Sequence, residues 1–307
     1  MSARDRVATL VAGMPVEPQY PSQGATLFVD LERRTVVRAY TPLAVVRSLL
    51  AGRGANMFYL HKMLDETKTP LDPDIPLIFG AGVLTGLVPS AARGNATSWA
   101  PESGVLMDSN CGDYFPSFMK MYGIDHLVLF GQATAWTMLR ITQGHGVEFM
   151  DAGPYVGLDN IDMRERVALD LGGTWTRDLA MVNVTRAGEN QVLTAGIMGG
   201  PKAIYARGGP GAKMGSLHLK GIVTIAQTRE FPTAQPYKPY NRVIAQKLLA
   251  TSVVKNALSV TGTPFLYKPS RLLGAMGTKN NQETTWTESL DAQHFDQYRP
   301  GMEGCFR

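Results

Sequence analysis

A glycine-rich run from 206 to 216 constrains the fold of this chain more than any other segment. It reads Ala-Arg-Gly-Gly-Pro-Gly-Ala-Lys-Met-Gly-Ser, so four glycines stand beside an arginine and a lysine. Glycine adopts backbone conformations that other residues avoid and lets a ligand approach the main chain, so such a cluster offers N–H groups and positive charge to an anion. The run therefore predicts a site for a phosphate-bearing molecule.

Two familiar phosphate loops differ from this run in spacing. A dinucleotide loop requires Gly-x-Gly-x-x-Gly before a helix, whereas Gly209, Gly211 and Gly215 are spaced Gly-x-Gly-x-x-x-Gly and precede a strand-like segment. A Walker loop ends in Gly-Lys-Ser/Thr, whereas Lys213 here stands before Gly215-Ser216. Taken alone, the run also fits a tight glycine turn between two strands that binds no ligand.

The composition limits the class of protein. With 307 residues, of which 44% are hydrophobic, the chain can bury a sizeable core in one large domain or two. Its two distant cysteines argue against a disulfide scaffold and suit a reducing compartment. The net charge of +4 comes without a long run of Lys or Arg, and no apolar stretch reaches the length of a membrane span. We expect a cytoplasmic protein that binds no nucleic acid and does not span a membrane.

Apolar patterns predict alternating strands and helices. The first strand covers Ala25 to Asp30, and the turn at 143–146 joins two strands as a hairpin. Thr41 is expected as the N-cap of a helix that ends at Gly52, and a second helix from Met163 to Leu171 ends at two glycines. The other predicted strands lie at 77–79, 127–130, 136–141, 181–184 and 222–226.

Prolines mark the expected domain boundaries. Those at 15, 18 and 21 predict an irregular N-terminal arm, 1–21, without a core of its own. Those at 232, 236 and 239 predict a linker, after which apolar residues recur at helical spacing from Ile244 to Val253. We expect an α+β chain with a β-rich domain at 22–228 and the beginning of a helical domain at 229–307.

An ordered series of short motifs carries a family resemblance. Between 22 and 307 the chain resembles the aldehyde:ferredoxin oxidoreductase family, whose members hold tungsten, or occasionally molybdenum, on two pterins. The matching segments are Phe28 to Leu31, Ala51 to Gly54, Gly82 to Gly86, Arg93, Ser109 to Gly112, Met119 to Asp125, Arg186 to Asn190, Ala206 to Ser216, Leu219 to Val223, Gly262 to Pro264 and Gly304 to Arg307.

The resemblance implies a fold and a set of cofactor-binding residues. Two sheets would cradle the pterins, with helical domains closing over them. Arg93 and Arg207 match arginines that contact the pterin phosphates, and arginine suits this task because its rigid fork of donors fits phosphate oxygens. Asn110 and Gly208 match residues whose main-chain carbonyls bind a bridging Mg²⁺, an ion that prefers oxygen ligands. Gly112, Gly209 and Gly211 would lie beside the cofactor.

The resemblance also implies a reaction and partners. Family members oxidise an aldehyde to a carboxylic acid and pass electrons through a [4Fe–4S] cluster to ferredoxin or an iron–sulfur subunit, and Cys305 matches the first cysteine ligand of that cluster. Relatives that serve as the active-site subunit of aromatic-ring reductases provide one alternative. A non-catalytic split chain that needs a partner provides another, because family members are about twice as long. Homo-oligomers and hetero-oligomers both remain open, and the catalytic acid and base are not identified.

Overall fold

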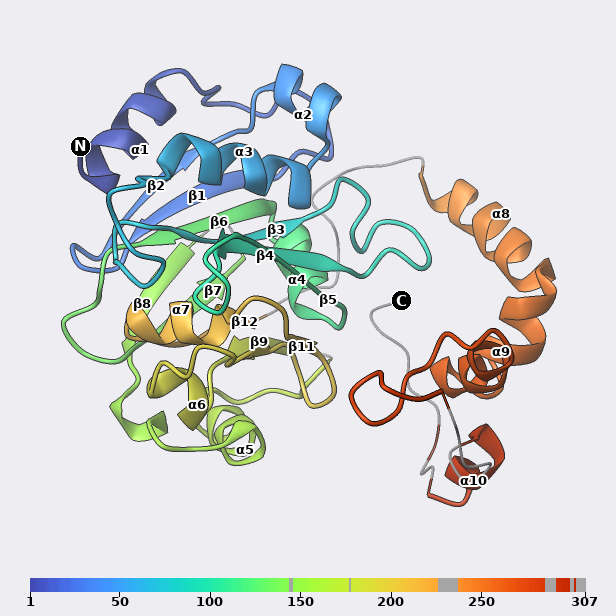
Figure 1. Cartoon of the computed structure of the whole chain (residues 1–307). Coiled ribbons are helices and arrows are strands. Elements are labelled where there is room, and N and C mark those ends of the chain that lie inside the picture. The colour runs from blue at the N-terminus through green and yellow to red at the C-terminus, as the bar shows by residue number, and fades with distance from the viewer. Residues whose placement is uncertain (144–145, 177, 226–236, 285–290, 299–300, 302–307) are drawn as a thin grey trace. The chain divides into compact units, whose positions relative to one another are not determined.

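Two six-stranded mixed sheets lie face to face in a computed structural model of the chain (Figure 1). The structure describes all residues except 144–145, 177, 226–236, 285–290, 299–300 and 302–307. It divides into a first unit, 1–234, and a second unit, 235–304. The boundary that we expected between 228 and 229 lies outside the described residues. The α+β class and the two sheets of the first unit are confirmed.

Each sheet contains one parallel strand pair among antiparallel neighbours. The first sheet has the order β2 (Thr35–Ala39), β1 (Ala25–Asp30), β6 (Ile124–Phe130), β3 (Leu77–Ala81), β4 (Gly94–Trp99), β5 (Leu106–Cys111). The second has the order β11 (Ile204–Tyr205), β10 (Ile197–Met198), β9 (Leu179–Asn183), β12 (Leu219–Ile225), β7 (Thr137–Thr142), β8 (Gly146–Asp151).

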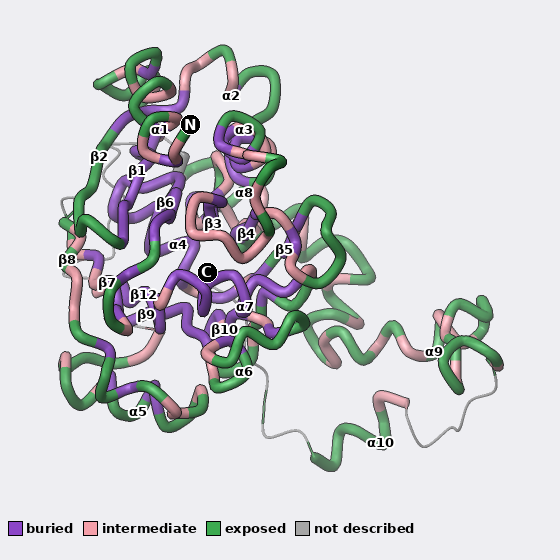
Figure 2. Tube along the Cα trace, turned by 60° about the vertical axis from the view of Figure 1, so that its left-hand side comes forward, coloured by how far each residue is buried: buried purple, intermediate pink, exposed green. Residues whose placement is uncertain are grey.

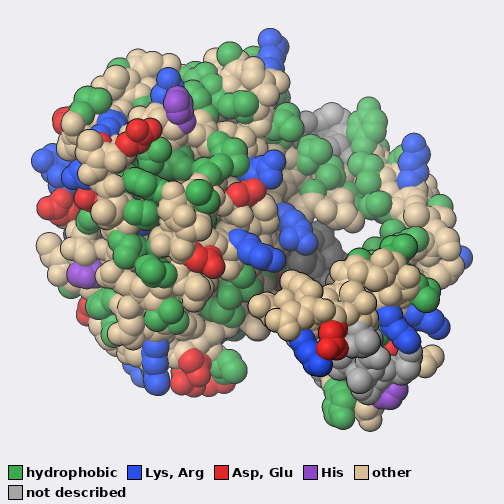
Figure 3. Space-filling view, viewed as in Figure 1, with side chains coloured by type: hydrophobic (Ala, Val, Ile, Leu, Met, Phe, Trp, Pro, Cys, Tyr) green, Lys and Arg blue, Asp and Glu red, His purple; other side chains and the backbone are tan. Residues whose placement is uncertain are grey.

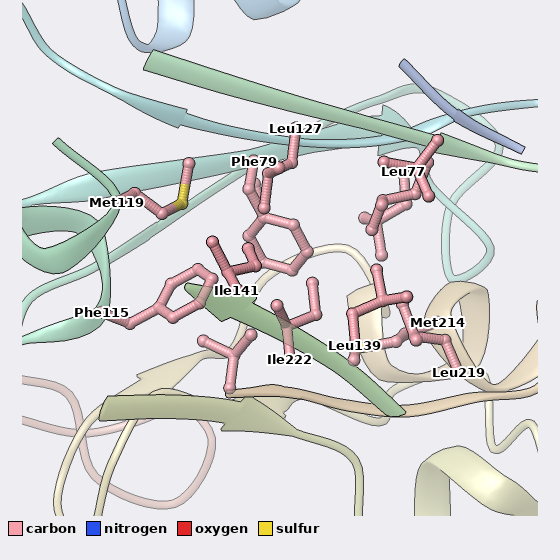
Figure 4. Close-up of a cluster of buried hydrophobic side chains, with 14 of the residues drawn as sticks. Leu77, Phe79, Phe115, Met119, Leu127, Leu139, Ile141, Met214, Leu219 and Ile222 are labelled. Carbon is pink, nitrogen blue, oxygen red and sulfur yellow. The ribbon is translucent and has the colours of Figure 1, made fainter. Parts of the chain in front are cut away.

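The main core lies between the two sheets (Figure 4). Side chains alternate along each strand, so Leu127 and Leu129 point into this core while Val128 joins the cluster on the outer face of the first sheet. Because both faces are covered, the central strands are apolar without interruption. Helix α4 (Phe115–Met121) contributes Phe115 and Met119 to the same core. Met119 and Met121 are therefore packing residues of this helix.

Helices cover the outer faces of both sheets (Figure 1). The clusters of buried side chains place α1 (Ala3–Ala12) and α3 (Arg53–Met63) over the first sheet and α5 (Asn160–Leu171) over the second. The central strands of the first unit are buried along most of their length (Figure 2). The remaining helical segments of this unit are α2 (Leu43–Leu49), Gly153–Tyr155, α6 (Arg186–Glu189) and α7 (Pro210–Ser216).

Two N-terminal expectations are wrong. Helix α1 replaces the irregular arm: Ser2 and Asp5 form a reciprocal capping box, and Val7 is buried in the outer cluster of the first sheet. Thr41 does not cap α2, which has Pro42 at its N-cap position. The Thr41 hydroxyl instead lies 2.7 Å from the hydroxyl of Tyr59.

The second unit is helical. It contains α8 (Tyr237–Ala250), α9 (Tyr267–Leu272), α10 (Ala292–Asp296) and the turns Val254–Leu258 and Thr263–Leu266. None of the side chains that the structure describes between 239 and 301 is buried, as the pink and green tube of this unit shows (Figure 2). Large apolar side chains are exposed on it, including Val243, Leu249, Val253, Leu272, Leu273 and Phe295. The described residues of this unit therefore form no core of their own.

Candidate cofactor site

Arg93, just before β4, and Asn110, on the neighbouring strand β5, lie at one edge of the first sheet. Asn95 of β4 pairs with Asn110 of β5, and Gly94 pairs with Cys111. Arg93 directly precedes Gly94, the first residue of this ladder. The register therefore brings Arg93 beside the end of β5, which Gly112 follows in the chain. The Thr85 hydroxyl donates a hydrogen bond of 3.0 Å to the main-chain carbonyl of Arg93, which fixes the backbone while the side chain stays exposed.

Arg207 reaches the same edge from the second sheet. It follows β11, which lies beside β5 (Figure 1). The main-chain N–H of Arg207 donates a hydrogen bond of 3.1 Å to the hydroxyl of Ser109, the residue before Asn110. Segments that are about 100 residues apart in sequence are thus joined at the end of the first sheet.

The two arginine side chains carry uncompensated charge. Both are exposed, and neither makes an ion pair with any residue that the structure describes. In the view of Figure 3, Lys and Arg side chains are spread over the surface, some of them beside Asp and Glu side chains. Two unpaired guanidinium groups on adjoining segments make this edge suited to an anion with more than one phosphate.

The glycine-rich run forms a helix and not a turn between strands. Pro210 begins α7, and Gly209 precedes it in the left-handed conformation with φ of 75°. A Cβ atom at Gly209 would lie 1.9 Å from the Leu193 carbonyl oxygen. The N–H of Gly208 donates to Glu102 Oε2 at 3.2 Å, and the N–H of Gly211 donates to the Ala195 carbonyl at 2.7 Å. Packing within the chain therefore accounts for much of this run.

Lys213 is not available to an anion, contrary to the charge that we expected the run to offer. Its side chain is fully buried, and Nζ donates a hydrogen bond of 2.7 Å to the Asp72 carbonyl. Burial lowers the pKa of Lys213 to about 7, although Asp72 and Asp74 act in the opposite direction. The lysine of the run belongs to the interior of the fold, and Arg207 supplies its exposed charge.

Two further motifs of the series meet in a buried ion pair. Lys220 Nζ lies 2.5 Å from Glu189 Oε1 and also donates to the Val184 carbonyl at 2.8 Å. Both oxygens of Glu189 accept from the N–H of Gly157. The Lys220–Glu189 ion pair thus joins the segment Leu219 to Val223 to the segment Arg186 to Asn190.

Sequence reasoning missed the polar residues that hold the edge together. Asn95, Asp108 and Ser109 all contact the segment that contains Asn110 or Arg207. A pattern in the sequence could have revealed this polar edge. Polar side chains stand two residues apart in both strands, Asn95 with Thr97 and Asp108 with Asn110, at positions where a core strand would carry apolar side chains. Cys305, the expected cluster ligand, lies outside the described residues.

The sequence of the first unit matches that of an oxidoreductase family. Residues 26–226, about two thirds of the chain, match the family model described as aldehyde ferredoxin oxidoreductase, N-terminal domain. The chain belongs to the aldehyde ferredoxin oxidoreductase family.

Curated relatives agree with this assignment. The tungsten-containing aldehyde ferredoxin oxidoreductase of Pyrococcus furiosus is 30% identical over 78% of this chain and 39% of its own length. The protein of the same name from Thermococcus kodakarensis is 29% identical over 86% of this chain and 43% of its own length. An aliphatic sulfonate oxidoreductase, WOR-like subunit, from P. furiosus is 30% identical over 66% of this chain and 34% of its own length. The chain therefore spans less than half the length of the relatives it matches.

A solved structure has the same fold. The active-site complex BamBC of benzoyl coenzyme A reductase, in complex with 1,5-dienoyl-CoA, superposes with a TM-score of 0.77 at 23% identity. The match covers 93% of this chain and 46% of that one. Among the described residues, no helix is long and apolar enough to cross a bilayer.

Proposed function

We propose that this chain cradles a tungsten or molybdenum bis-pterin cofactor. The guanidinium groups of Arg93 and Arg207 would bind its phosphates, and the main-chain carbonyls of Asn110 and Gly208 would bind a Mg²⁺ ion between them. The observation that carries the proposal is the hydrogen bond from the Arg207 N–H to Ser109, because it joins the Arg207 segment to the strand that bears Asn110. Gly112, Gly209 and Gly211 would complete the backbone beside the pterins.

The residues present fit such a ligand by their chemistry. Two exposed, unpaired arginines supply rigid donor pairs for phosphate oxygens, and Mg²⁺ accepts main-chain carbonyl oxygens beside phosphate and water. The buried Lys213 takes no part. When bound, the metal and its pterins would supply the redox chemistry, while these residues orient the cofactor.

We take oxidation of an aldehyde as the reaction. Two of the relatives described above are named for aldehyde and ferredoxin. Water would supply the added oxygen, and the oxidation would release two protons and two electrons. A [4Fe–4S] cluster, with Cys305 as one ligand, would supply the route for the electrons to ferredoxin or an iron–sulfur subunit. The sulfonate oxidoreductase subunit and the benzoyl coenzyme A reductase complex keep other substrates open, including an aromatic ring.

The activity would require polypeptide beyond these residues. The second unit exposes large apolar side chains and buries none that the structure describes, so these side chains would need a surface to pack against. The matched relatives are more than twice as long as the region they share with this chain. Such chain could continue this one or come from a partner, in which case the residues described here would bind cofactor only in the assembly.

Metal content tests the proposal directly. Tungsten and molybdenum per chain are measured by elemental analysis in the purified protein and in the variants Arg93→Ala and Arg207→Ala. Loss of a charge-assisted hydrogen bond should weaken cofactor retention by about tenfold or more. The control Arg166→Ala removes an exposed arginine from α5, where it pairs with Asp170, and should leave the metal content unchanged. A parent protein without either metal, or variants that retain it fully, would refute the proposal.

A further inference from the structure

A row of polar residues crosses the first sheet and ends at Asn110. The strand register aligns Thr26 of β1 with His126 of β6, His126 with Gly80 of β3, and Gly80 with Asn95 of β4. Asn95 in turn pairs with Asn110 at the edge of the sheet. All of these side chains except that of Asn110 are buried. A continuous polar row in the interior is unusual because buried polar groups cost free energy unless they are hydrogen-bonded.

Helix α3, which packs on the outer face of the first sheet, contributes Asn56 to the row. Arg53, Asn56 and Tyr59 are three residues apart and therefore share one face of the helix. Asn56 lies over Gly80, where a Cβ atom would be 2.4 Å from Asn56 Oδ1. Glycine at position 80 is thus required by the close approach of this amide.

The amide orientation of Asn56 follows from its surroundings. Its Nδ2 faces three acceptors: Asn95 Oδ1 at 3.1 Å, the Asn95 carbonyl at 3.2 Å and the Ile78 carbonyl at 3.4 Å. Its Oδ1 therefore faces His126 Nδ1 at 2.8 Å, and His126 must carry its proton on Nδ1. Burial lowers the pKa of His126 to about 3, which keeps the imidazole neutral.

The hydrogen bonds of Asn95 keep the same donor-to-acceptor order as far as the edge of the sheet. Asn95 Oδ1 accepts from Asn56 and from the Thr97 hydroxyl at 2.5 Å, so Asn95 Nδ2 faces outward. Nδ2 donates to Asn110 Oδ1 at 3.2 Å and to Asp108 Oδ1 at 2.5 Å. The Asp108 carboxylate, which can only accept, also accepts from Asn110 Nδ2 at 3.3 Å and pairs with Arg53 at 2.9 Å. Every amide of the row thus has one allowed orientation.

We propose that Asn56 and Asn95 are positioning residues that hold Asn110 and the end of β5 in one conformation before the cofactor binds. Strand β5 is the last in its sheet and has a strand partner on one side only. The row gives it a second attachment, from the buried helix α3, and a satisfied buried network rigidifies what it joins. This inference rests on the proposed function, which gives the main-chain carbonyl of Asn110 to Mg²⁺.

Three variants separate positioning from general stability. Asn95→Ala removes the centre of the row, and Asn110→Ala removes its exposed end while leaving the main-chain carbonyl in place. Ser98→Ala is the matched control: it lies on β4, on the opposite face from Asn95, and loses one buried hydrogen bond to the Pro76 carbonyl. The readouts are amide hydrogen exchange at residues 106–112 and tungsten per folded chain, both measured in the protein as isolated.

Positioning predicts that both asparagine variants increase exchange at 106–112 by about tenfold and lower the tungsten content severalfold. Ser98→Ala should keep both within twofold of the parent. Unchanged exchange in both asparagine variants, or faster exchange with full tungsten content, overturns the inference. If the parent protein carries neither tungsten nor molybdenum, the proposed function fails, and the exchange rates alone decide whether the row holds β5.

Discussion

Replacing Lys213 with methionine should stabilise the protein more at neutral pH than at alkaline pH. The lysine is fully buried, and its pKa falls from 10.5 to about 7 because the charged form loses its hydration. Methionine has a similar length and no charge. The Asp72 carbonyl, which Lys213 Nζ contacts, keeps a hydrogen bond from the Ile75 N–H, so the substitution leaves no orphaned acceptor.

The magnitude follows from the two pKa values. Between pH 7 and 10.5 the unfolded chain holds a proton on Lys213 that the folded chain releases, so unfolding takes up a proton and the free energy of unfolding rises with pH. Relative to alkaline solution, a shift of this size destabilises the folded protein by about 4 kcal/mol at pH 7 and about 2 kcal/mol at pH 9. The advantage of Lys213→Met should therefore shrink by roughly 2 kcal/mol over these two pH units.

Urea unfolding of the parent and of Lys213→Met at pH 7, 8 and 9 measures this change. The difference between the two proteins cancels the titration of all other groups that the substitution does not touch. A difference that stays constant from pH 7 to 9 would refute the reasoning, because it would mean that Lys213 remains charged in the folded protein. Cofactor retention should be unaffected by the substitution, since the lysine lies in the interior.

Two other substitutions test the packing of the motif segments, with Arg166→Ala as an exposed control. Lys220→Met leaves Glu189 as an unpaired buried charge and should lower the free energy of unfolding by about 3–5 kcal/mol. Arg166→Ala breaks an exposed pair and should change the free energy of unfolding far less. Thermal unfolding of the two variants compares them, and equal losses would contradict the buried pair. Gly209→Ala introduces a side chain at a φ of 75° and against the Leu193 carbonyl, and should cost more than about 2 kcal/mol in urea unfolding. A Gly209→Ala protein as stable as the parent would show that this glycine is not required by the fold.

Local patterns predicted the central apolar strands because strand burial leaves a direct mark on the sequence, but they did not predict β2, β4, β5, β10 or β11. The first strand was expected at Ala25 to Asp30 and lies there, and α5 ends at Leu171 before Gly172 as expected. Its start was placed at Met163 but lies at Asn160, because the Asp159 side chain caps the helix through the N–H groups of Ile161 and Asp162. The capping box of Ser2 and Asp5 was likewise present in the sequence. The arm was nevertheless predicted as irregular because of the prolines at 15, 18 and 21, which follow the helix.

The roles of charged and polar residues were harder to predict from the sequence than the strands were. Lys213 and Arg207 stand in one run, and only burial distinguishes the interior lysine from the exposed arginine. Thr41 has the chemistry of an N-cap, yet its hydroxyl is used by Tyr59 on a neighbouring helix. Contacts such as these join segments that are distant in sequence, and no local pattern encodes them.

The amino-acid sequence by itself determined the central apolar strands, the glycine and arginine motifs and, through their order, the family. Only the tertiary structure decided which motif residues are exposed at the sheet edge and which are buried in the fold. The physical reason is that hydrophobic alternation and capping act between near neighbours in the chain, whereas the desolvation of Lys213 and the polar row to Asn110 arise from elements that meet only when the sheets and α3 pack together.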